Sequence, residues 1–181
     1  TFVMHIITDI SKVRLQYERL SDIAFHDELT GVYNRRKFNE IFLQEFRRAK
    51  RYKSDLSVIF FDIDHFKKIN DNFGHDVGDS VLKELSSLVK THVREIDFFA
   101  RWGGEEFIIL LPETQTLQAQ TLAEHIREQV QENDFHAVGK VTASFGVTQL
   151  KNNEQQKTLI KRLDNALYKA KQNGRNRVEA I

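Results

Sequence analysis

The sequence of 181 residues contains no cysteine, which excludes a disulfide framework and thiolate chemistry. It contains a single proline, and no apolar run approaches the roughly 18 residues of a membrane span. No secretory signal is visible in it. We therefore expect a cytoplasmic location and no membrane contact from this chain, which leaves open that a longer protein is attached to a membrane through other regions.

An excess of one charge is also lacking, because 27 Lys and Arg residues against 26 Asp and Glu residues give a formal net charge of +1. Such a balance argues against a dedicated binder of nucleic acid or acidic polymers, so we expect no nucleic-acid partner. Phenylalanine is abundant, with 14 residues, and the length suits one domain with an appendage. The composition therefore indicates a well-packed domain and not a disordered tail.

The first 24 residues differ from the rest of the chain. Because the sequence begins at Thr1, we interpret it as a piece of a longer protein. Apolar residues then recur at alternating short spacings that form a heptad seam: Ile10, Val13, Tyr17, Leu20 and Ala24. Two interpretations stay open. One is a parallel dimer stalk that carries a signal from an upstream domain, and the other is a helix that lies on its own domain.

The remaining residues alternate between strand and helix patterns. Strands are predicted at 56–62, 96–102, 105–111 and 140–149, with an edge strand at 177–181. Helices are predicted at 35–51, 79–93, 117–131 and 159–172, with a turn-rich loop at 71–78 and Asp79 as a helix cap. The central order is the split β-α-β-β-α-β arrangement. We therefore expect an α+β fold, an α/β sandwich whose ferredoxin-like core sheet is flanked by helices.

A glycine pair inside residues 97–111 marks the most informative stretch. Two apolar runs flank Gly103 and Gly104, which predicts a β-hairpin with a two-residue turn. Glu105 and Glu106 follow the turn, and successive strand residues point to opposite faces. One acid at the edge of a buried strand, beside glycines, suits a cation or a phosphate. Taken alone, the hairpin fits a tip of solvated charges equally well.

Strand order favours the cation site. A helical crossover makes the strands at 56–62 and 96–102 parallel, and the hairpin makes the next strand antiparallel. If that third strand lies between the first two, its start at Glu105 lies beside Asp62. Paired carboxylates with room for substrate phosphates suit Mg²⁺. Asp64 shares a face with Asp62 only if the strand continues, so Asp64 is the weaker candidate ligand.

Further polar residues follow Asp62 along the chain. Lys67 lies where an ammonium and backbone N–H groups can hold a polyphosphate. Asn70 offers a donor and an acceptor and Asp79 offers acceptors, which together match a guanine edge. Their alternative roles are a turn for Asn70 and a helix cap for Asp79. Asp62 and Asp64 also suit metal-dependent glycosyl transfer from a nucleotide sugar, although the glycine hairpin argues against that reading.

Other nucleotide and metal motifs are missing. No G-x-x-x-x-G-K-[ST] run is present, which excludes a P-loop protein. No H-E-x-x-H run and no cysteine ligand argue against zinc. An EF-hand does not fit either, because Ile69 or Phe73 would occupy the loop position that needs an acid.

Several motifs together resemble the GGDEF family, the diguanylate cyclases, in its GGEEF form. The first is the hairpin itself, RWGGEEF at residues 101–107. The others follow the family's order along the chain: DELTGVYNRR at 27–36, FDIDHFKKIND at 61–71, GHDVGD at 74–79, ALYKAK at 166–171 and GRN at 174–176. The resemblance covers residues 24–181 and is far more specific than a five-letter match.

This resemblance implies an enzyme that condenses two GTP molecules into cyclic di-GMP and two pyrophosphates. Each subunit of a homodimer would hold one GTP, and the 3′-hydroxyl of each GTP would attack the α-phosphate of the other. The two half-sites would therefore face each other. The resemblance also implies the palm-like form of the fold seen in nucleotide cyclases. The implied cofactor is Mg²⁺, with Mn²⁺ as a substitute.

The resemblance also assigns roles by position. The metal would be bound by Asp62, the Ile63 carbonyl and Glu105, with Glu105 or else Glu106 activating the hydroxyl. Lys67 is the expected cation of the transition state. The GTP contacts form a larger set: Phe66, Lys67, Asn70, His75, Asp79, Gly103, Gly104, Lys171 and Arg175.

Two further resemblances concern regulation. Arg94 and Asp97 match the R-x-x-D inhibitory site at which the product, cyclic di-GMP, binds, although a surface salt bridge is the alternative. Some relatives carry an arginine at the position of His125 that helps to hold the product, so a weaker inhibitory site is implied. The competing interpretation of the whole chain is a silent domain that senses GTP or cyclic di-GMP without turnover.

Residues 7–11 resemble the end of a PAS sensory domain that continues into its signalling helix. The implied division places the end of the sensory domain and the dimer stalk at 1–24 and the catalytic domain at 25–181. An upstream sensor would then control how two catalytic domains face each other.

Overall fold

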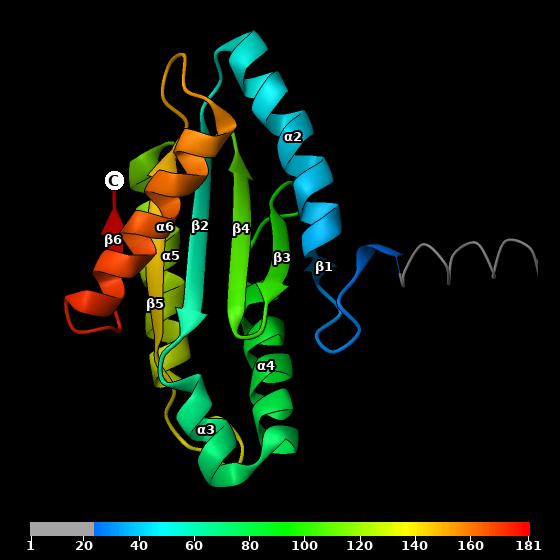
Figure 1. Cartoon of the computed structure of the whole chain (residues 1–181), viewed down its shortest axis with the longest axis vertical. Coiled ribbons are helices and arrows are strands. Elements are labelled where there is room, and N and C mark those ends of the chain that lie inside the picture. The colour runs from blue at the N-terminus through cyan, green and yellow to red at the C-terminus, as the bar shows by residue number, and fades with distance from the viewer. Residues whose placement is uncertain (1–23) are drawn as a thin grey trace, which may run out of the picture.

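The computed structural model describes residues 24–181, shown in Figure 1. The predicted heptad seam up to Leu20 and the PAS-like residues 7–11 lie outside the described residues. Within the described range, no helix combines the length and the apolar character that crossing a membrane requires.

A single mixed sheet forms the centre of the domain. Its six strands lie in the order β1-β3-β4-β2-β5-β6. Their bounds are β1 (Tyr33–Asn34), β2 (Leu56–Ile63), β3 (Phe98–Gly103), β4 (Glu106–Pro112), β5 (Ala143–Gln149) and β6 (Val178–Ala180). Strand β4 lies between β2 and β3 and is antiparallel to both, so β2 and β3 are parallel. The strand order that the sequence predicts is therefore confirmed, and β6 is the predicted edge strand.

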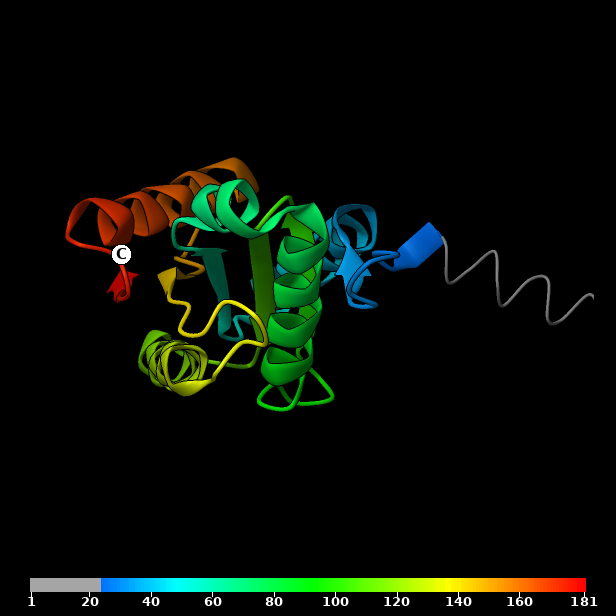
Figure 2. The same cartoon turned by 90° about the horizontal axis from the view of Figure 1, so that it is seen from below.

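Helices cover both faces of this sheet, which makes the fold α+β (Figures 1 and 2). Their bounds are α2 (Arg35–Tyr52), α3 (Phe66–Phe73), α4 (His75–Lys90), α5 (Thr116–Glu132) and α6 (Gln156–Gln172). Helices α4 and α5 pack on one face, and α2 and α6 pack on the other. The short helix α3 follows the end of β2 (Figure 1).

Strand β2 is buried along its whole length, as its continuous apolar run predicts. Val58 and Phe60 belong to the core shared with α2 and α6, whereas Ile59 and Phe61 belong to the core shared with α4 and α5. The Phe61 ring stacks between Phe107 and Phe145, with centroids at 5.4 and 4.8 Å. This aromatic row across neighbouring strands fixes the backbone immediately before Asp62.

The predicted loop at 71–78 is wrong, because these residues are helical. Helix α3 ends at Phe73 and α4 begins at His75, with only Gly74 between them. The φ of Gly74 is +86°, a conformation that favours glycine and allows one helix to turn directly into the next. Asp79 consequently lies inside α4 and does not cap it. The helix also ends at Lys90, three residues earlier than predicted.

The hairpin turn is shifted by one residue from the prediction. Gly103 pairs with Glu106 across the ladder, so the turn consists of Gly104 and Glu105. Gly104 has a φ of +51°, which the glycine permits. Strand β1 was not predicted, and its two residues pair in parallel with β3.

We expect Gly146→Ala to destabilise the fold strongly. A Cβ on Gly146 of β5 would lie 2.4 Å from the Leu167 nitrogen and 2.9 Å from the Leu163 carbonyl oxygen, both in the backbone of α6. Backbone cannot move aside as a side chain can, so the free energy of unfolding should fall by about 3 kcal/mol in chemical denaturation. Gly103→Ala is the matched control, because nothing lies within 4 Å of its added Cβ. Equal stability of the two variants would contradict the packing of α6 on β5.

Candidate active site

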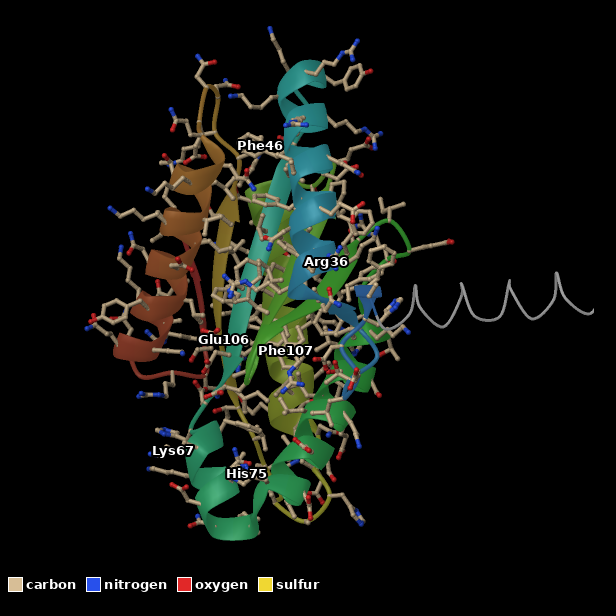
Figure 3. The ribbon with its side chains drawn as sticks, turned by 45° about the vertical axis from the view of Figure 1, so that its right-hand side comes forward. Arg36, Phe46, Lys67, His75, Glu106 and Phe107 are labelled. Atoms are coloured by element: carbon tan, nitrogen blue, oxygen red, sulfur yellow. The ribbon has the colours of Figure 1, made fainter. Side chains whose placement is uncertain are left out.

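Two segments far apart in the sequence meet where β2 ends and β4 begins. Asp62 and Glu106 are direct partners in the antiparallel ladder. Beside them, the Ile63 N–H donates to the Glu105 carbonyl at 3.4 Å. The predicted proximity of Asp62 and the hairpin is therefore present, but the residue directly opposite Asp62 is Glu106. In Figure 3, Glu106 lies toward the middle of the molecule, above Lys67 and His75.

Lys171, from the last turn of α6, pairs with the same carboxylate. Its Nζ lies 2.9 Å from Asp62 Oδ2, a contact that the sequence did not predict. Asp62 is only 7% exposed, and burial raises its pKa to about 6. The Lys171 ammonium opposes this rise, whereas the carboxylates of Glu105 and Glu106 add to it. Burial also raises the pKa of Glu106. The site therefore concentrates negative charge that a cation would stabilise.

The donor groups at this point fit a divalent cation of the magnesium type. The carboxylates of Asp62 and Glu105 lie close enough to repel each other, and Ile63, which is hydrogen-bonded to Glu105 through its N–H, also carries a backbone carbonyl. Among residues 24–181, no three His, Cys, Asp or Glu side chains are already arranged to hold a metal by themselves. Mg²⁺ needs few protein carboxylates, because it keeps waters and takes substrate phosphates as ligands. The fit is therefore to a metal that arrives with a phosphorylated substrate.

Helix α3 brings cationic and N–H groups to the same end of the sheet. His65 precedes the helix with a φ of +58°, which turns the chain from β2 into α3. Phe66 is buried and Lys67 is exposed in the first turn. On the other side, Arg175 follows α6 and is also exposed. Lys67 therefore belongs to the helix that follows Asp62 along the chain, and Arg175 lies four residues after Lys171, which contacts Asp62.

Asn70 shows an unsatisfied polar atom. Its Oδ1 is buried and has no hydrogen-bond partner among the described residues. The side chain packs on the backbone of Gly78, where an added Cβ would lie 1.9 Å from Asn70 Oδ1 and 3.2 Å from the Phe66 ring. Asp79 is the next residue of α4 and is half-buried. A buried acceptor without a partner is rare in proteins, so this position is suited to a ligand's N–H group.

Asp64 differs from Asp62 in its surroundings. Its carboxylate accepts hydrogen bonds from Ser144 Oγ at 2.6 Å, from Thr142 Oγ1 at 2.7 Å and from the Asn176 N–H at 3.0 Å. These donors come from β5, the residue before it and the loop after α6, which the sequence could not connect. The carboxylate of Asp64 is therefore already held by three hydrogen-bond donors of the protein itself.

The hairpin is held from outside by a second ion pair. Arg101 Nη1 lies 3.0 Å from Asp27 Oδ1, and Arg101 Nε donates to the Gly104 carbonyl at 2.8 Å. Asp27 also accepts from the Thr30 N–H and hydroxyl. Although burial acts against ionisation, the Thr30 and Arg101 hydrogen bonds prevail and lower the pKa of Asp27. The DELTGVYNRR motif at 27–36 and the RWGGEEF motif at 101–107 are thus joined at the hairpin turn.

Arg94 and Asp97 lie together before β3. Asp97 Oδ2 accepts from the Arg94 backbone N–H at 2.9 Å, while its Oδ1 is buried without a partner among the described residues. Burial raises the pKa of Asp97. Within residues 24–181 no side-chain salt bridge joins the two residues, and a cavity of about 270 Å³ lies beside them. His125 Nε2 lies 3.2 Å from His92 Nδ1, and His92 and Asp97 line a second, smaller cavity.

Comparison with known proteins identifies the family. The profile described as "Diguanylate cyclase, GGDEF domain" matches residues 24–177. The chain belongs to the GGDEF family. It is 41% identical over 175 residues to the diguanylate cyclase DgcM of Escherichia coli K12, covering 97% of this chain and 43% of DgcM. It is 43% identical over 159 residues to DgcP of Pseudomonas aeruginosa, covering 86% of this chain and 24% of DgcP.

Solved GGDEF structures share the fold. The coiled coil and GGDEF domain of DgcB from Caulobacter crescentus, in complex with c-di-GMP, aligns with a TM-score of 0.91 at 29% identity. That alignment covers 99% of this chain and 97% of the DgcB chain. The active GGEEF domain of a Vibrio cholerae diguanylate cyclase aligns with a TM-score of 0.78 at 44% identity, covering 81% and 96%. The chain spans less than half the length of the curated relatives DgcM and DgcP.

Proposed function

We propose that this chain is the catalytic domain of a diguanylate cyclase that converts two GTP into cyclic di-GMP and two pyrophosphates. The observation that carries the proposal is the meeting of Asp62 with the Gly103–Glu106 hairpin at the end of β2. In the reaction, each 3′-oxygen forms a bond to the α-phosphorus of the other GTP. The bond from that phosphorus to the β-phosphate oxygen breaks, and pyrophosphate leaves.

Asp62, the Ile63 carbonyl and Glu105 are the proposed metal ligands. A bound Mg²⁺, or Mn²⁺ in its place, supplies charge neutralisation for the phosphates. Glu105 is the proposed acceptor of the hydroxyl proton, with Glu106 as the alternative. The position of Glu106 directly across from Asp62 keeps this alternative open.

Cationic residues take the phosphates in this proposal. Lys67 at the start of α3 balances the charge that develops during transfer, and Lys171 and Arg175 approach from the end of α6. Gly103 and Gly104 have no side chains and let phosphate oxygens come close to the hairpin. Phosphoryl transfer depends mainly on positioning and charge, and these residues supply both.

Guanine recognition is proposed for the junction of α3 and α4. The unpartnered Asn70 Oδ1 supports an acceptor for a guanine N–H, and Asp79 offers a carboxylate from the next helix. Phe66 packs beside this position, and His75 at the start of α4 is the proposed contact to the base or ribose.

The test is to incubate the purified chain with GTP and Mg²⁺ and to identify the products by chromatography and mass spectrometry. We expect cyclic di-GMP and pyrophosphate, with a specific rate that rises with protein concentration because two subunits must meet. Nucleotide binding without product would favour the silent sensor. Turnover of a nucleotide sugar in a parallel incubation, without turnover of GTP, would favour glycosyl transfer. The names of DgcM and DgcP and the c-di-GMP bound to DgcB support the cyclase.

Metal affinity is expected to depend on pH through Asp62. Its pKa of about 6 lies above the ordinary value, so protons compete with the metal below about pH 6. The ionised fraction falls from about nine tenths at pH 7 to about one tenth at pH 5, so the affinity should fall about tenfold. Water-proton relaxation with Mn²⁺, measured across this range, checks the effect. A flat profile, or one that persists in Asp62→Asn, would contradict it.

Product inhibition is proposed for Arg94 and Asp97. The unpartnered Asp97 Oδ1 and the exposed Arg94 side chain suit a guanine edge and a phosphate respectively. His125 stands where some relatives carry arginine, and it already contacts His92, which supports weaker inhibition.

Arg94→Ala is expected to raise the cyclic di-GMP concentration for half-inhibition at least tenfold, because it removes a charge-assisted contact. The uninhibited rate should stay unchanged, and Lys83→Ala on the exposed side of α4 is the matched control. Initial rates measured against added cyclic di-GMP test this expectation. Unchanged inhibition in Arg94→Ala would rule out the assignment.

The remaining partners are proposed from the same resemblance. A homodimer through the N-terminal stalk would bring two half-sites face to face, under the control of an upstream sensory domain. One solved relative, the cyclase SiaD, is in complex with its activator SiaC. We place the domain in the cytoplasm because its proposed substrate, GTP, is found there.

A further inference from the structure

The loop that follows α6 has an unusual backbone. Gly174, Arg175 and Asn176 have φ values of +115°, +63° and +46°, three consecutive residues in the left-handed region. Only glycine adopts this region without cost, so Arg175 and Asn176 need support from their surroundings. In Figure 1 this loop lies beside the end of α6, at the end of the sheet where β2 finishes.

Three contacts provide that support. The Arg175 N–H donates to the Ala170 carbonyl at 3.0 Å, which closes the end of α6. The Asn176 side chain bonds to α5, because Arg127 Nη1 donates to its Oδ1 at 3.0 Å and its Nδ2 donates to Gln131 Oε1 at 2.9 Å. The third contact runs from the Asn176 N–H to Asp64 Oδ2 at 3.0 Å. Asp64, the first residue after β2, therefore ties the loop to the end of the strand that carries Asp62.

Asp64 is well suited to this task. It is 6% exposed, and the hydroxyls of Thr142 and Ser144 fix the orientation of its carboxylate. Its own N–H donates to the Thr142 carbonyl at 2.8 Å, so its backbone is fixed as well. An acceptor held this rigidly determines where the Asn176 N–H must lie.

The residue that depends on this geometry is Arg175. Its side chain is exposed and forms no ion pair with any residue in 24–181, so the backbone of the loop is what determines where this side chain begins and in which direction its Cα–Cβ bond leaves. Lys171, one turn earlier, already reaches Asp62. We propose that Asp64 is a positioning residue, which fixes the loop through Asn176 so that Arg175 points at the substrate's phosphates. This inference rests on the proposed function only for the target of Arg175.

A double-mutant cycle with Asp64→Ala and Arg175→Gln tests the proposal. The readout is the dissociation constant for a non-hydrolysable GTP analogue in the presence of Mg²⁺, together with the kcat and KM for GTP. Asp64→Ala is expected to weaken analogue binding at least tenfold in the wild-type background. In the Arg175→Gln background the same change should cost less than twofold. Equal losses in both backgrounds would show that Asp64 does not act through Arg175.

Asp64→Asn separates positioning from metal binding and also covers the case in which Asp64→Ala does not fold. Its amide oxygen can still accept from the Asn176 N–H, while the hydroxyl of Ser144 can accept from its NH₂ group. We expect binding within threefold of wild type. A loss as large as tenfold would show that the charge of Asp64 is required and would overturn the proposal.

Thr121→Val on the exposed side of α5 is the matched control, because its hydroxyl donates to the Leu117 carbonyl of the same helix and contacts neither Asp64 nor the loop. It should bind the analogue within twofold of wild type.

If the analogue binds and the cycle is non-additive but no cyclic di-GMP forms, the proposed function fails and the role of Asp64 stands. If cyclic di-GMP forms and the cycle is additive, the inference fails and the function stands. A wild-type chain that does not bind the analogue contradicts both.

Discussion

Replacing Glu105 by alanine is expected to lower the rate of cyclic di-GMP formation by about a thousandfold. Glu105 lies in the hairpin turn, and its carbonyl accepts from the Ile63 N–H, so the residue sits at the end of β2 beside Asp62. In the proposed reaction its carboxylate completes the metal's donor set and accepts the hydroxyl proton. This single substitution therefore removes both a metal ligand and the proton acceptor, and the two losses together account for the large fall in rate. The measurement is the initial rate of product formation at saturating GTP and Mg²⁺.

Two further variants make this result specific. Glu40→Ala removes an exposed carboxylate on α2 that pairs with Lys37, and it should leave the rate unchanged. Glu106→Ala tests the neighbouring acid, which faces Asp62 across the ladder. If Glu106→Ala loses the activity and Glu105→Ala keeps it, the roles of the two acids are exchanged. Full activity in both variants would remove the hairpin from the mechanism.

The strand order and the identity of the site segments were predictable because they depend on short-range patterns. A continuous apolar run gives β2, and a glycine pair between apolar runs gives the hairpin. The handedness of the crossover and the antiparallel hairpin then leave few ways to place β4. These constraints suffice to bring Asp62 near Glu105 without any knowledge of side-chain contacts.

The errors come from residues whose conformation depends on distant neighbours. Residues 71–78 contain glycine, asparagine and aspartate, which predict a turn, but all of them except Gly74 belong to α3 or α4, and these two helices pack together where Gly78 meets Asn70. The pairing of Lys171 with Asp62 joins residues from opposite ends of the domain. The bond from Asp64 to Asn176 does the same. No local pattern encodes such contacts, so only the folded chain reveals them.

The site combines charges that oppose one another, and this affects how it binds substrate. Burial and the nearby glutamates disfavour the ionised form of Asp62, while Lys171 favours it. A divalent cation would relieve the repulsion among the carboxylates of Asp62, Glu105 and Glu106. The Lys171 ammonium, which now pairs with Asp62, would then be available to pair with the substrate's phosphates. We therefore expect metal and nucleotide to bind cooperatively, because each compensates a charge that the other leaves unpaired.

Gly78→Ala is expected to raise the KM for GTP by roughly 10- to 100-fold while the domain stays folded. The added Cβ would lie 1.9 Å from Asn70 Oδ1, so the Asn70 amide must leave its position. The atom displaced is the buried acceptor proposed to bind guanine. Gly78 lies inside α4, where alanine favours the helix more than glycine does, so the loss should not arise from unfolding. Steady-state kinetics and a thermal melt separate binding from stability.

The companion variants decide whether the effect passes through Asn70. Asn70→Ala should raise the KM by a similar factor, and the double variant should be no worse than either single one, because both remove the same contact. Ser80→Ala, an exposed position two residues further along α4, is the control and should leave the KM unchanged. If the two losses multiply, Gly78 contributes to the site independently of Asn70. An unchanged KM in Gly78→Ala would place guanine recognition elsewhere, because the acceptor at Asn70 would then be dispensable.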